Sequence, residues 1–204
     1  MTDYNLPDIH LLEDKTKRFL TWIPDKTYIV LGASNQAEDA LYVDNVEQDH
    51  ITVLKRPSGG QTVMLTPNNL VIAVVFIDPK SLQPKDVFER INKIIIAAIE
   101  KAGISHLSMK GISDIAVDGK KISGSAIYRR KDALLYHAVL NMGEHAITFE
   151  KYLKHPSKEP DYRQGRSHSE FVTSLKEIGY TQSYEYLENI LALSFETSLN
   201  GSIF

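Results

Sequence analysis

The stretch Asp114-Ile115-Ala116-Val117-Asp118-Gly119-Lys120-Lys121-Ile122-Ser123-Gly124-Ser125-Ala126 decides the fold class of this chain. Asp118-Gly119 is a two-residue turn signal, so the chain is expected to reverse there. Two strands are expected to follow, from Ile122 to Tyr128 and from Ala133 to Asn141, separated by a charged turn. Strands grouped in meanders, rather than alternating regularly with helices, favour an α+β fold over a doubly wound parallel sheet.

The chain on either side of this block predicts further elements. Leu70 to Ile77 is nearly all apolar, which predicts a strand buried on both faces. An apolar stripe at mostly helical spacing, with Gly103 placed to end it, predicts a long helix. Its residues are Phe88, Ile91, Ile95, Ala98 and Ile99. Helices are also expected over Ala37 to Asp49 and Tyr184 to Leu193, and strands over Thr27 to Leu31 and Ile51 to Leu54.

Length and composition set the broad class. The 204 residues are enough for one domain, expected over 1–204, and too few for two large ones. The net charge of -3 gives no general attraction to nucleic acid or anionic membrane, and no apolar run approaches the roughly 20 residues that cross a bilayer. We therefore expect a cytoplasmic protein with neither nucleic acid nor membrane as partner. The chain has no cysteine, which excludes disulfides and any mechanism with a cysteine nucleophile.

The first candidate site is the loop Arg56-Pro57-Ser58-Gly59-Gly60. Two glycines let a backbone approach a ligand closely, and Arg56 adds a positive charge suited to phosphate or carboxylate. A surface turn with an incidental arginine explains the same residues. No Gly-Lys-Ser/Thr follows, so this is not a Walker loop.

The second candidate site is the expected hairpin itself. The turn at Asp118-Gly119 allows Asp114 and Lys121 to lie on neighbouring strands, where a carboxylate can orient the amine or bind a metal. The small residues Gly124, Ser125 and Ala126 leave room beside the strand for something bulky. A polar hairpin with solvated lysines is the alternative interpretation.

Together these segments resemble the lipoate–protein ligase A family of the biotin and lipoate ligase superfamily. That family carries an R-R-x-S-G-G-G loop, which Lys55 to Gly60 resembles, and a D-[apolar]-x-x-x-G-[basic]-K-[apolar]-x-G-[small]-A stretch, which Asp114 to Ala126 resembles. Tyr28 to Asn35 and His137 to Asn141 also resemble family segments, in the same order along the chain. The resemblance spans roughly residues 20 to 145, and implies a biotin/lipoate ligase-like domain (class II synthetase-like) with a central mixed, largely antiparallel sheet flanked by helices.

The resemblance also implies a chemistry. Lys121 would be the catalytic lysine, contacting the acyl carbonyl and the α-phosphate. Asp114 would lie near the phosphates and bind Mg²⁺. ATP and lipoate would be substrates, lipoyl-AMP the intermediate, and a lysine of a lipoyl-domain protein the acceptor. The implied acyl-adenylate-binding residues are Arg56, Ser58, Gly59, Gly60, Asn69, Asp114, Gly124, Ser125, Ala126 and His137, although for His137 a purely structural role has equal weight.

The chain departs from the family mainly around the nucleotide region. Gln61 replaces the third glycine, the usual His-Asp reads Leu65-Thr66, and the acidic N-terminal helix is not recognisable within residues 1–20. These changes keep open a non-catalytic lipoyl or acyl-adenylate binder and a cysteine-independent octanoyl or lipoyl transferase. Because 204 residues leave little room for the accessory C-terminal domain common in the family, three alternatives are expected for the adenylate: a separate accessory domain as partner, a preformed acyl-adenylate, or catalysis of transfer alone. The basic patch Asp161 to His168 is expected to be a solvated loop in preference to an acceptor or adenylate contact.

Overall fold

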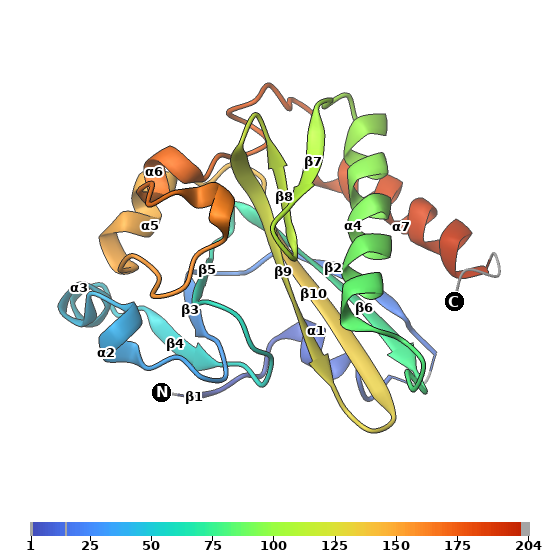
Figure 1. The fold of residues 1–204 in the computed structure, drawn as a ribbon, viewed down its shortest axis with the longest axis horizontal. Coiled ribbons are helices and arrows are strands. Elements are labelled where there is room, and N and C mark those ends of the chain that lie inside the picture. Colours follow the sequence, from blue (N-terminus) through green and yellow to red (C-terminus); the bar gives the residue numbers. More distant parts are fainter. Residues whose placement is uncertain (1, 15, 201–204) are drawn as a thin grey trace.

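The strands form two sheets in the computed structural model, which describes residues 2–14 and 16–200 (Figure 1). The larger sheet has the order β2-β6-β10-β9-β8-β7, and all neighbours in it are antiparallel. Its strands are β2 (Phe19–Trp22), β6 (Asn69–Ile77), β7 (Leu107–Lys110), β8 (Asp114–Val117), β9 (Lys120–Arg129) and β10 (Ala133–Asn141).

The smaller sheet is mixed. It has the order β1-β4-β3-β5, in which β4 is parallel to both β1 and β3, whereas β5 is antiparallel to β3. Its strands are β1 (Thr2–Asp3), β3 (Tyr28–Leu31), β4 (Thr52–Lys55) and β5 (Val63–Leu65). The two sheets together confirm the predicted α+β class and the largely antiparallel pairing.

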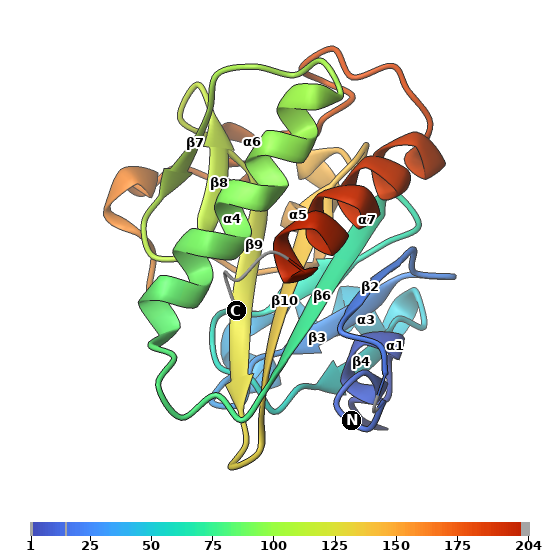
Figure 2. The same ribbon diagram turned by 90° about the vertical axis from the view of Figure 1, so that its right-hand side faces the viewer.

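Two long helices, α4 (Pro84–Lys101) and α7 (Tyr184–Asn200), cover one face of the larger sheet (Figure 2). The predicted apolar stripe of α4 enters the main core, where Ile91, Ile95 and Ile99 are completely buried. Gly103 has φ +98°, the left-handed conformation expected just after a helix end. Within the described part of the chain, no helix is long and apolar enough to cross a membrane.

Strand β6 is buried on both faces, as its continuous apolar sequence predicts. Leu70 and Ile72 belong to the core beneath α4 and α7, whereas Val71 packs with Val30 and Leu65 of the smaller sheet. The remaining helices are short. They are α1 (Pro7–His10), α2 (Ala37–Ala40), α3 (Val43–Gln48), α5 (Ala146–Tyr152), α6 (His168–Phe171) and the 3₁₀ turn η1 (Asp161–Arg163). Of these, α2 and α3 lie beside the smaller sheet, whereas α1 packs against β6 and α6 against β9 of the larger sheet (Figure 1).

Three sequence-based boundaries need correction. The single helix predicted from Ala37 to Asp49 is wrong, because Leu41 is extended and forms an isolated bridge with Leu153 that separates α2 from α3. The C-terminal helix begins at Tyr184 as predicted but continues to Asn200. A short N-terminal helix, α1, is present where the sequence shows none, because four residues are too few to display a helical repeat.

Candidate functional site

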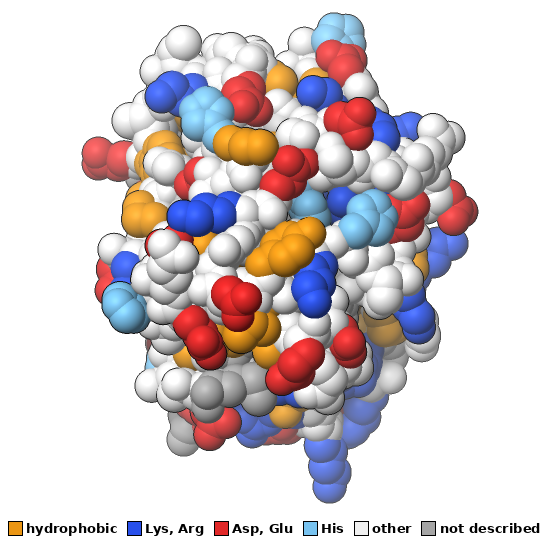
Figure 3. All heavy atoms as spheres, turned by 90° about the vertical axis from the view of Figure 1, so that its left-hand side faces the viewer, with side chains coloured by type: hydrophobic (Ala, Val, Ile, Leu, Met, Phe, Trp, Pro, Cys, Tyr) orange, Lys and Arg blue, Asp and Glu red, His pale blue; other side chains and the backbone are white. Residues whose placement is uncertain are grey.

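A cavity of about 850 Å³ lies against the face of the larger sheet opposite α4 and α7. Strands β8, β9 and β10 supply one wall, and β5 with the loop after β4 supplies another. The segment 153–163 crosses beside them. Figure 3 views the molecule from the left-hand side of Figure 1, the side of the smaller sheet and short helices, where positive and negative side chains are interspersed.

An ion pair between a partly exposed lysine and a buried carboxylate marks one side of this cavity. Lys121 Nζ lies 2.8 Å from Asp114 Oδ1, and Asp114 is only 7% exposed. A β-bulge permits this contact, because Ala116 pairs with Lys121 and Ile115 with Ser123, which leaves Ile122 as the extra residue. Since β-strand side chains alternate, the bulge places Lys121 on the same face as Asp114 and its strand partner, Gly124.

Gly124 provides the space that the lysine side chain occupies. A Cβ built at this position would lie 2.6 Å from Lys121 Nζ and 3.4 Å from Asp114 Oδ1. The sequence predicts room beside the small residues from Gly124 to Ala126. At Gly124, this space is occupied by the side chain of Lys121.

The second oxygen of Asp114 has a different partner. The hydroxyl of Tyr162 donates to Asp114 Oδ2 at 2.8 Å. Burial, reinforced by Asp114, strongly raises the pKa of Tyr162, so the phenol remains a donor at neutral pH. Both oxygens of the carboxylate are therefore bound by residues 7 and 48 positions away in the chain.

The loop after β4 is built around the guanidinium of Arg56. Its Nη2 donates to the carbonyl oxygens of Gly59 and Gln61, both at 2.8 Å, and its Nη1 donates to Val30 O at 3.1 Å. Burial lowers the pKa of Arg56 to about 10, which leaves it charged at neutral pH. Arg56 thus holds the loop in shape besides facing the cavity.

A line of polar contacts leads from this loop to the N-terminal helix. Arg56 Nε donates to Ser58 Oγ at 2.9 Å, and Ser58 Oγ lies 2.7 Å from His137 Nε2. His137 Nδ1 lies 2.8 Å from Oδ2 of the fully buried Asp8. The hydroxyl of Tyr4 donates to the same carboxylate. This line, called the buried relay below, joins β10 to α1 and the Arg56 loop.

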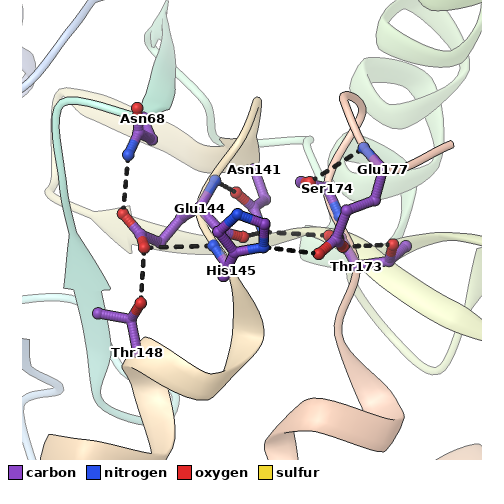
Figure 4. Close-up of polar contacts among 8 residues, drawn as sticks. All are labelled: Asn68, Asn141, Glu144, His145, Thr148, Thr173, Ser174 and Glu177. Atoms are coloured by element: carbon purple, nitrogen blue, oxygen red, sulfur yellow. Dashed lines mark hydrogen bonds and ion pairs between the residues drawn. The ribbon is translucent and has the colours of Figure 1, made fainter. Parts of the chain in front are cut away.

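Asn69 belongs to a second polar cluster, which holds the end of β10. Figure 4 shows the neighbouring part of this cluster around Asn141 and Glu144. The side chain of Asn69 accepts from Thr66 N at 2.8 Å and contacts Asn141, which in turn binds the backbone of Glu144. The Glu144 carboxylate accepts hydrogen bonds from Asn68 at 3.1 Å and Thr148 at 2.7 Å. Burial opposes the charge, yet these hydrogen bonds lower the pKa of Glu144. The cluster is therefore an ionised anchor beneath the cavity wall.

Most of the predicted site residues meet at this cavity. Those that line it are Arg56, Gly60, Asn69, Asp114, Lys121, Gly124, Ser125, Ala126 and His137. Ser58 and Gly59 are not among the lining residues. Ser58 is 1% exposed, and its hydroxyl is directed to Arg56 and His137.

The sequence missed four residues at this site. Tyr4 and His168 line the cavity, Asp8 binds His137, and Tyr162 binds Asp114. The solvated-loop interpretation of the patch Asp161 to His168 is also wrong. Arg163 is 4% exposed and lines the cavity, and burial followed by the charge of Arg163 lowers the pKa of His168 to about 4.

Asp114, the expected magnesium ligand, does not belong to a cluster of metal-binding side chains among the described residues. Across residues 2–14 and 16–200, no group of three or more histidine or acidic side chains could hold a metal ion. Asp114 can offer one carboxylate, and Mg²⁺ at nucleotide sites commonly takes one or two carboxylates with phosphates and water. The residue fits an ion held mainly by phosphates.

The fold is that of known lipoate–protein ligases. A solved lipoate-protein ligase A bound with ATP superposes with a TM-score of 0.78 and 20% identity, covering 94% of this chain and 78% of that one. A bi-partite lipoate protein ligase from Thermoplasma acidophilum, solved in a study of that ligase and its E2 lipoyl domain, superposes with a TM-score of 0.76 and 19% identity. That match covers 89% of this chain and 70% of the other.

The sequence shows the same relationship. The lipoate-protein ligase LplJ of Bacillus subtilis (strain 168) is 24% identical over 193 residues, which cover 93% of this chain. This chain spans 57% of the length of that relative. Residues 7–196 match the family described as the lipoyl protein ligase A/B catalytic domain. Because that match spans most of the chain, the protein belongs to the lipoyl protein ligase A/B catalytic domain family.

Proposed function

We propose that this protein transfers a lipoyl group from lipoyl-AMP to a lysine of a lipoyl-domain acceptor. The observation that carries the proposal is the ion pair of Lys121 and Asp114 in a cavity of about 850 Å³. In the reaction, the acceptor amine attacks the acyl carbonyl carbon, the bond from that carbon to the phosphate oxygen breaks, AMP leaves with that electron pair, and the amine nitrogen releases one proton to solvent.

Lys121 supplies the positive charge that this step needs. Negative charge grows on the carbonyl oxygen during attack and passes to the phosphate as AMP departs. An ammonium group placed at both oxygens stabilises that charge, and its removal from such a site costs about 10²- to 10³-fold in rate. Lys121 is 31% exposed at its side chain, so a bound substrate can reach it.

The cavity also has a place for an acyl chain. Val30, Val63, Val71 and Val139 line it, and they pack in one cluster with Tyr4 of the buried relay. An apolar chain placed along these residues leaves water, which is favourable by about 25 cal/mol per Å² of apolar surface. The acyl group would lie there, with the phosphate toward Lys121.

We further propose that the adenylate is made from lipoate and ATP at the same cavity. When Mg²⁺ is bound it neutralises phosphate charge, with Asp114 as its protein ligand. The Thermoplasma ligase with a similar fold is bi-partite. By that likeness, an accessory domain is the proposed partner for adenylation. A cytoplasmic location stays a prediction.

The test begins with synthetic lipoyl-AMP and an apo lipoyl domain. Transfer appears as an increase in the acceptor's mass by one lipoyl group. Lys121→Ala should lower the rate about 10²- to 10³-fold, whereas Lys120→Ala, on the exposed neighbouring residue, should leave it unchanged. A second arm with lipoate, ATP and Mg²⁺, with and without an accessory domain, measures adenylation.

Two alternatives have distinct outcomes in the same experiment. Tight lipoyl-AMP binding without any transfer identifies a non-catalytic binder and contradicts the proposal. Transfer from an octanoyl or lipoyl donor protein, without nucleotide, identifies a cysteine-independent transferase. The absence of cysteine from the whole sequence excludes a cysteine thioester for that route.

A further inference from the structure

We propose that Tyr162 is a positioning residue that holds Asp114 when Lys121 leaves it to contact the substrate. The inference rests on the role proposed above for Lys121. Lys121 binds Oδ1 of Asp114 and Tyr162 binds Oδ2, both at 2.8 Å. The two partners therefore do not compete for one oxygen.

The need for a second partner follows from the burial of Asp114. Its residue surface is 7% exposed, so a carboxylate that lost all its partners would be strongly destabilised. The ammonium of Lys121 has three N–H donors, and moving its nitrogen into contact with a carbonyl and a phosphate lengthens the one bond that it makes to Asp114 Oδ1. The neutral donor of Tyr162 keeps the carboxylate satisfied and thereby lowers the cost of moving the lysine.

Tyr162 is itself held in place from several directions. Its ring lies 5.0 Å from that of Phe171 in α6. Arg166 Nη2 donates to the carbonyl oxygen of Tyr162 at 2.7 Å and to that of Gly119, in the hairpin turn, at 3.0 Å. The segment carrying Tyr162 is thus tied to the same hairpin that carries Lys121, which sets the hydroxyl at a defined distance from Asp114.

The chain contains a matched trio away from the cavity. Tyr152 donates to Asp49 Oδ2 at 2.6 Å, and Lys151 Nζ lies 2.5 Å from the same oxygen. These three residues are not among those that line the cavity. Tyr152→Phe therefore removes the same kind of hydrogen bond without touching the proposed site.

The kinetic test uses Tyr162→Phe, which keeps the ring against Phe171 and removes only the hydroxyl. Without that donor, Asp114 holds Lys121 more tightly, so kcat for transfer from lipoyl-AMP should fall about tenfold while KM changes less than about twofold. In an Asp114→Asn background the same substitution should have almost no further effect, because Tyr162 acts through that carboxylate. Tyr152→Phe should match the wild type.

A second measurement does not depend on activity. Trace acetylation of the folded, full chain, analysed by mass spectrometry, compares the labelling rate of Lys121 with that of Lys80, whose side chain is 80% exposed. Tyr162→Phe should lower the ratio by at least about twofold, because the amine is held by Asp114. Tyr152→Phe should leave it unchanged. Circular dichroism and urea unfolding establish that each variant is folded.

The outcomes separate the two proposals. If the wild type transfers no lipoyl group but Tyr162→Phe still lowers Lys121 labelling, the proposed function fails and the coupling stands. An unchanged labelling ratio, or kinetic effects of Tyr162→Phe and Asp114→Asn that simply add, overturns the role of Tyr162. If Tyr162→Phe is unstable, Tyr162→His, which retains a ring donor, is compared with the wild type instead. A Lys121 labelling ratio equal to that of the wild type supports the role of Tyr162, and a lowered ratio contradicts it.

Discussion

The ion pair of Lys121 and Asp114 depends on the absence of a side chain at Gly124. A methyl group there would lie 2.6 Å from Lys121 Nζ, which is the far end of a flexible side chain. Gly124→Ala should therefore displace the ammonium from Asp114 at a stability cost below about 1 kcal/mol. Lipoyl transfer should fall at least about tenfold, measured from initial rates with lipoyl-AMP.

Gly143→Ala is the control for that substitution. The nearest atom to its added methyl group would be Lys176 Cδ at 3.6 Å, an ordinary contact. This variant should keep the wild-type transfer rate. Equal rates for the two alanine variants would contradict the argument that Gly124 makes room for the lysine.

His168 predicts a loss of stability in mild acid. Burial, followed by the charge of Arg163, lowers its folded-state pKa from 6.5 to about 4, so as the pH falls the unfolded chain takes up the proton first. The contribution of His168 to the free energy of unfolding is therefore complete above about pH 6.5 and is lost as the pH falls toward 4. Solvent screening at this half-buried ring limits it to about 1–2 kcal/mol.

Urea unfolding at pH 7 and pH 4.5 measures this effect. His168→Gln has no group that titrates in that range, so its free energy of unfolding should fall less than that of the wild type between the two pH values. A parallel loss in both proteins would show that other groups cause the acid sensitivity.

The sequence was informative about single residues where a local motif surrounds them. Lys121 and Asp114 stand seven residues apart on either side of a recognisable turn. Asp8 and Tyr162 carry no such signal, because their partners lie 129 and 48 residues away. Only the tertiary fold brings a short N-terminal helix and a loop after α5 to these positions.

At the scale of elements, the hairpin of β8 and β9 was predictable but its bulge was not. Asp118 and Gly119 both have positive φ, 47° and 75°, as the predicted two-residue turn requires. The extra residue, Ile122, is apolar and fits either register of the strand pattern. Without the bulge, the alternation of side chains would place Lys121 and Gly124 on opposite faces.

The close contact between Gly32 and the Arg56 loop predicts a larger loss of stability. A methyl group on Gly32 would lie 2.1 Å from the carbonyl oxygen of Gly60, and a backbone atom cannot rotate away. Gly32→Ala should therefore shift the Arg56 loop and lower the free energy of unfolding by about 2 kcal/mol or more. Urea unfolding measures the change, and isothermal titration calorimetry should show weaker lipoyl-AMP binding.

Gly59→Ala offers a matched comparison for stability alone. Its added methyl group would meet no atom within 4 Å, and it lies in the same loop. Its free energy of unfolding should stay within about 0.5 kcal/mol of the wild type. A similar loss in both variants would mean that any side chain in these loops is unfavourable, whatever it contacts.

The other elements show when local sequence is sufficient. The apolar run at β6 and the stripe of α4 each depend on burial within one element, and both predictions are confirmed. The predicted helix from Ala37 to Asp49 failed because Leu41 pairs with Leu153, a contact that no local pattern reports. Tertiary pairing overrode helical propensity there.

At the scale of the whole molecule, stability and the proposed chemistry occupy opposite faces of the larger sheet. Leu191 of α7 is completely buried in the core beneath α4 and α7, away from the cavity. Leu191→Ala should lower the free energy of unfolding by about 2–5 kcal/mol. The affinity for lipoyl-AMP, measured by calorimetry at a temperature where the variant is folded, should stay within about twofold.

A large loss of affinity in this variant would show that the two faces are coupled.

The fold class itself was predictable from the grouping of strands, and the largely antiparallel pairing is confirmed. The strand order was not, because β2 pairs with β6 and β6 with β10 across long separations in the chain. Such pairings depend on which apolar faces meet in three dimensions.

The buried relay engages every polar side-chain atom along it. Arginine can only donate, so Ser58 Oγ accepts from Arg56 Nε, and the same oxygen lies 2.7 Å from His137 Nε2. The other ring nitrogen, Nδ1, lies 2.8 Å from Asp8 Oδ2, and Asp8 also receives the hydrogen of Tyr4. Although Tyr4 and His137 line the cavity, their polar hydrogens are all committed elsewhere. This end of the cavity therefore selects a ligand by its shape, because these two side chains have no hydrogen left to donate to it.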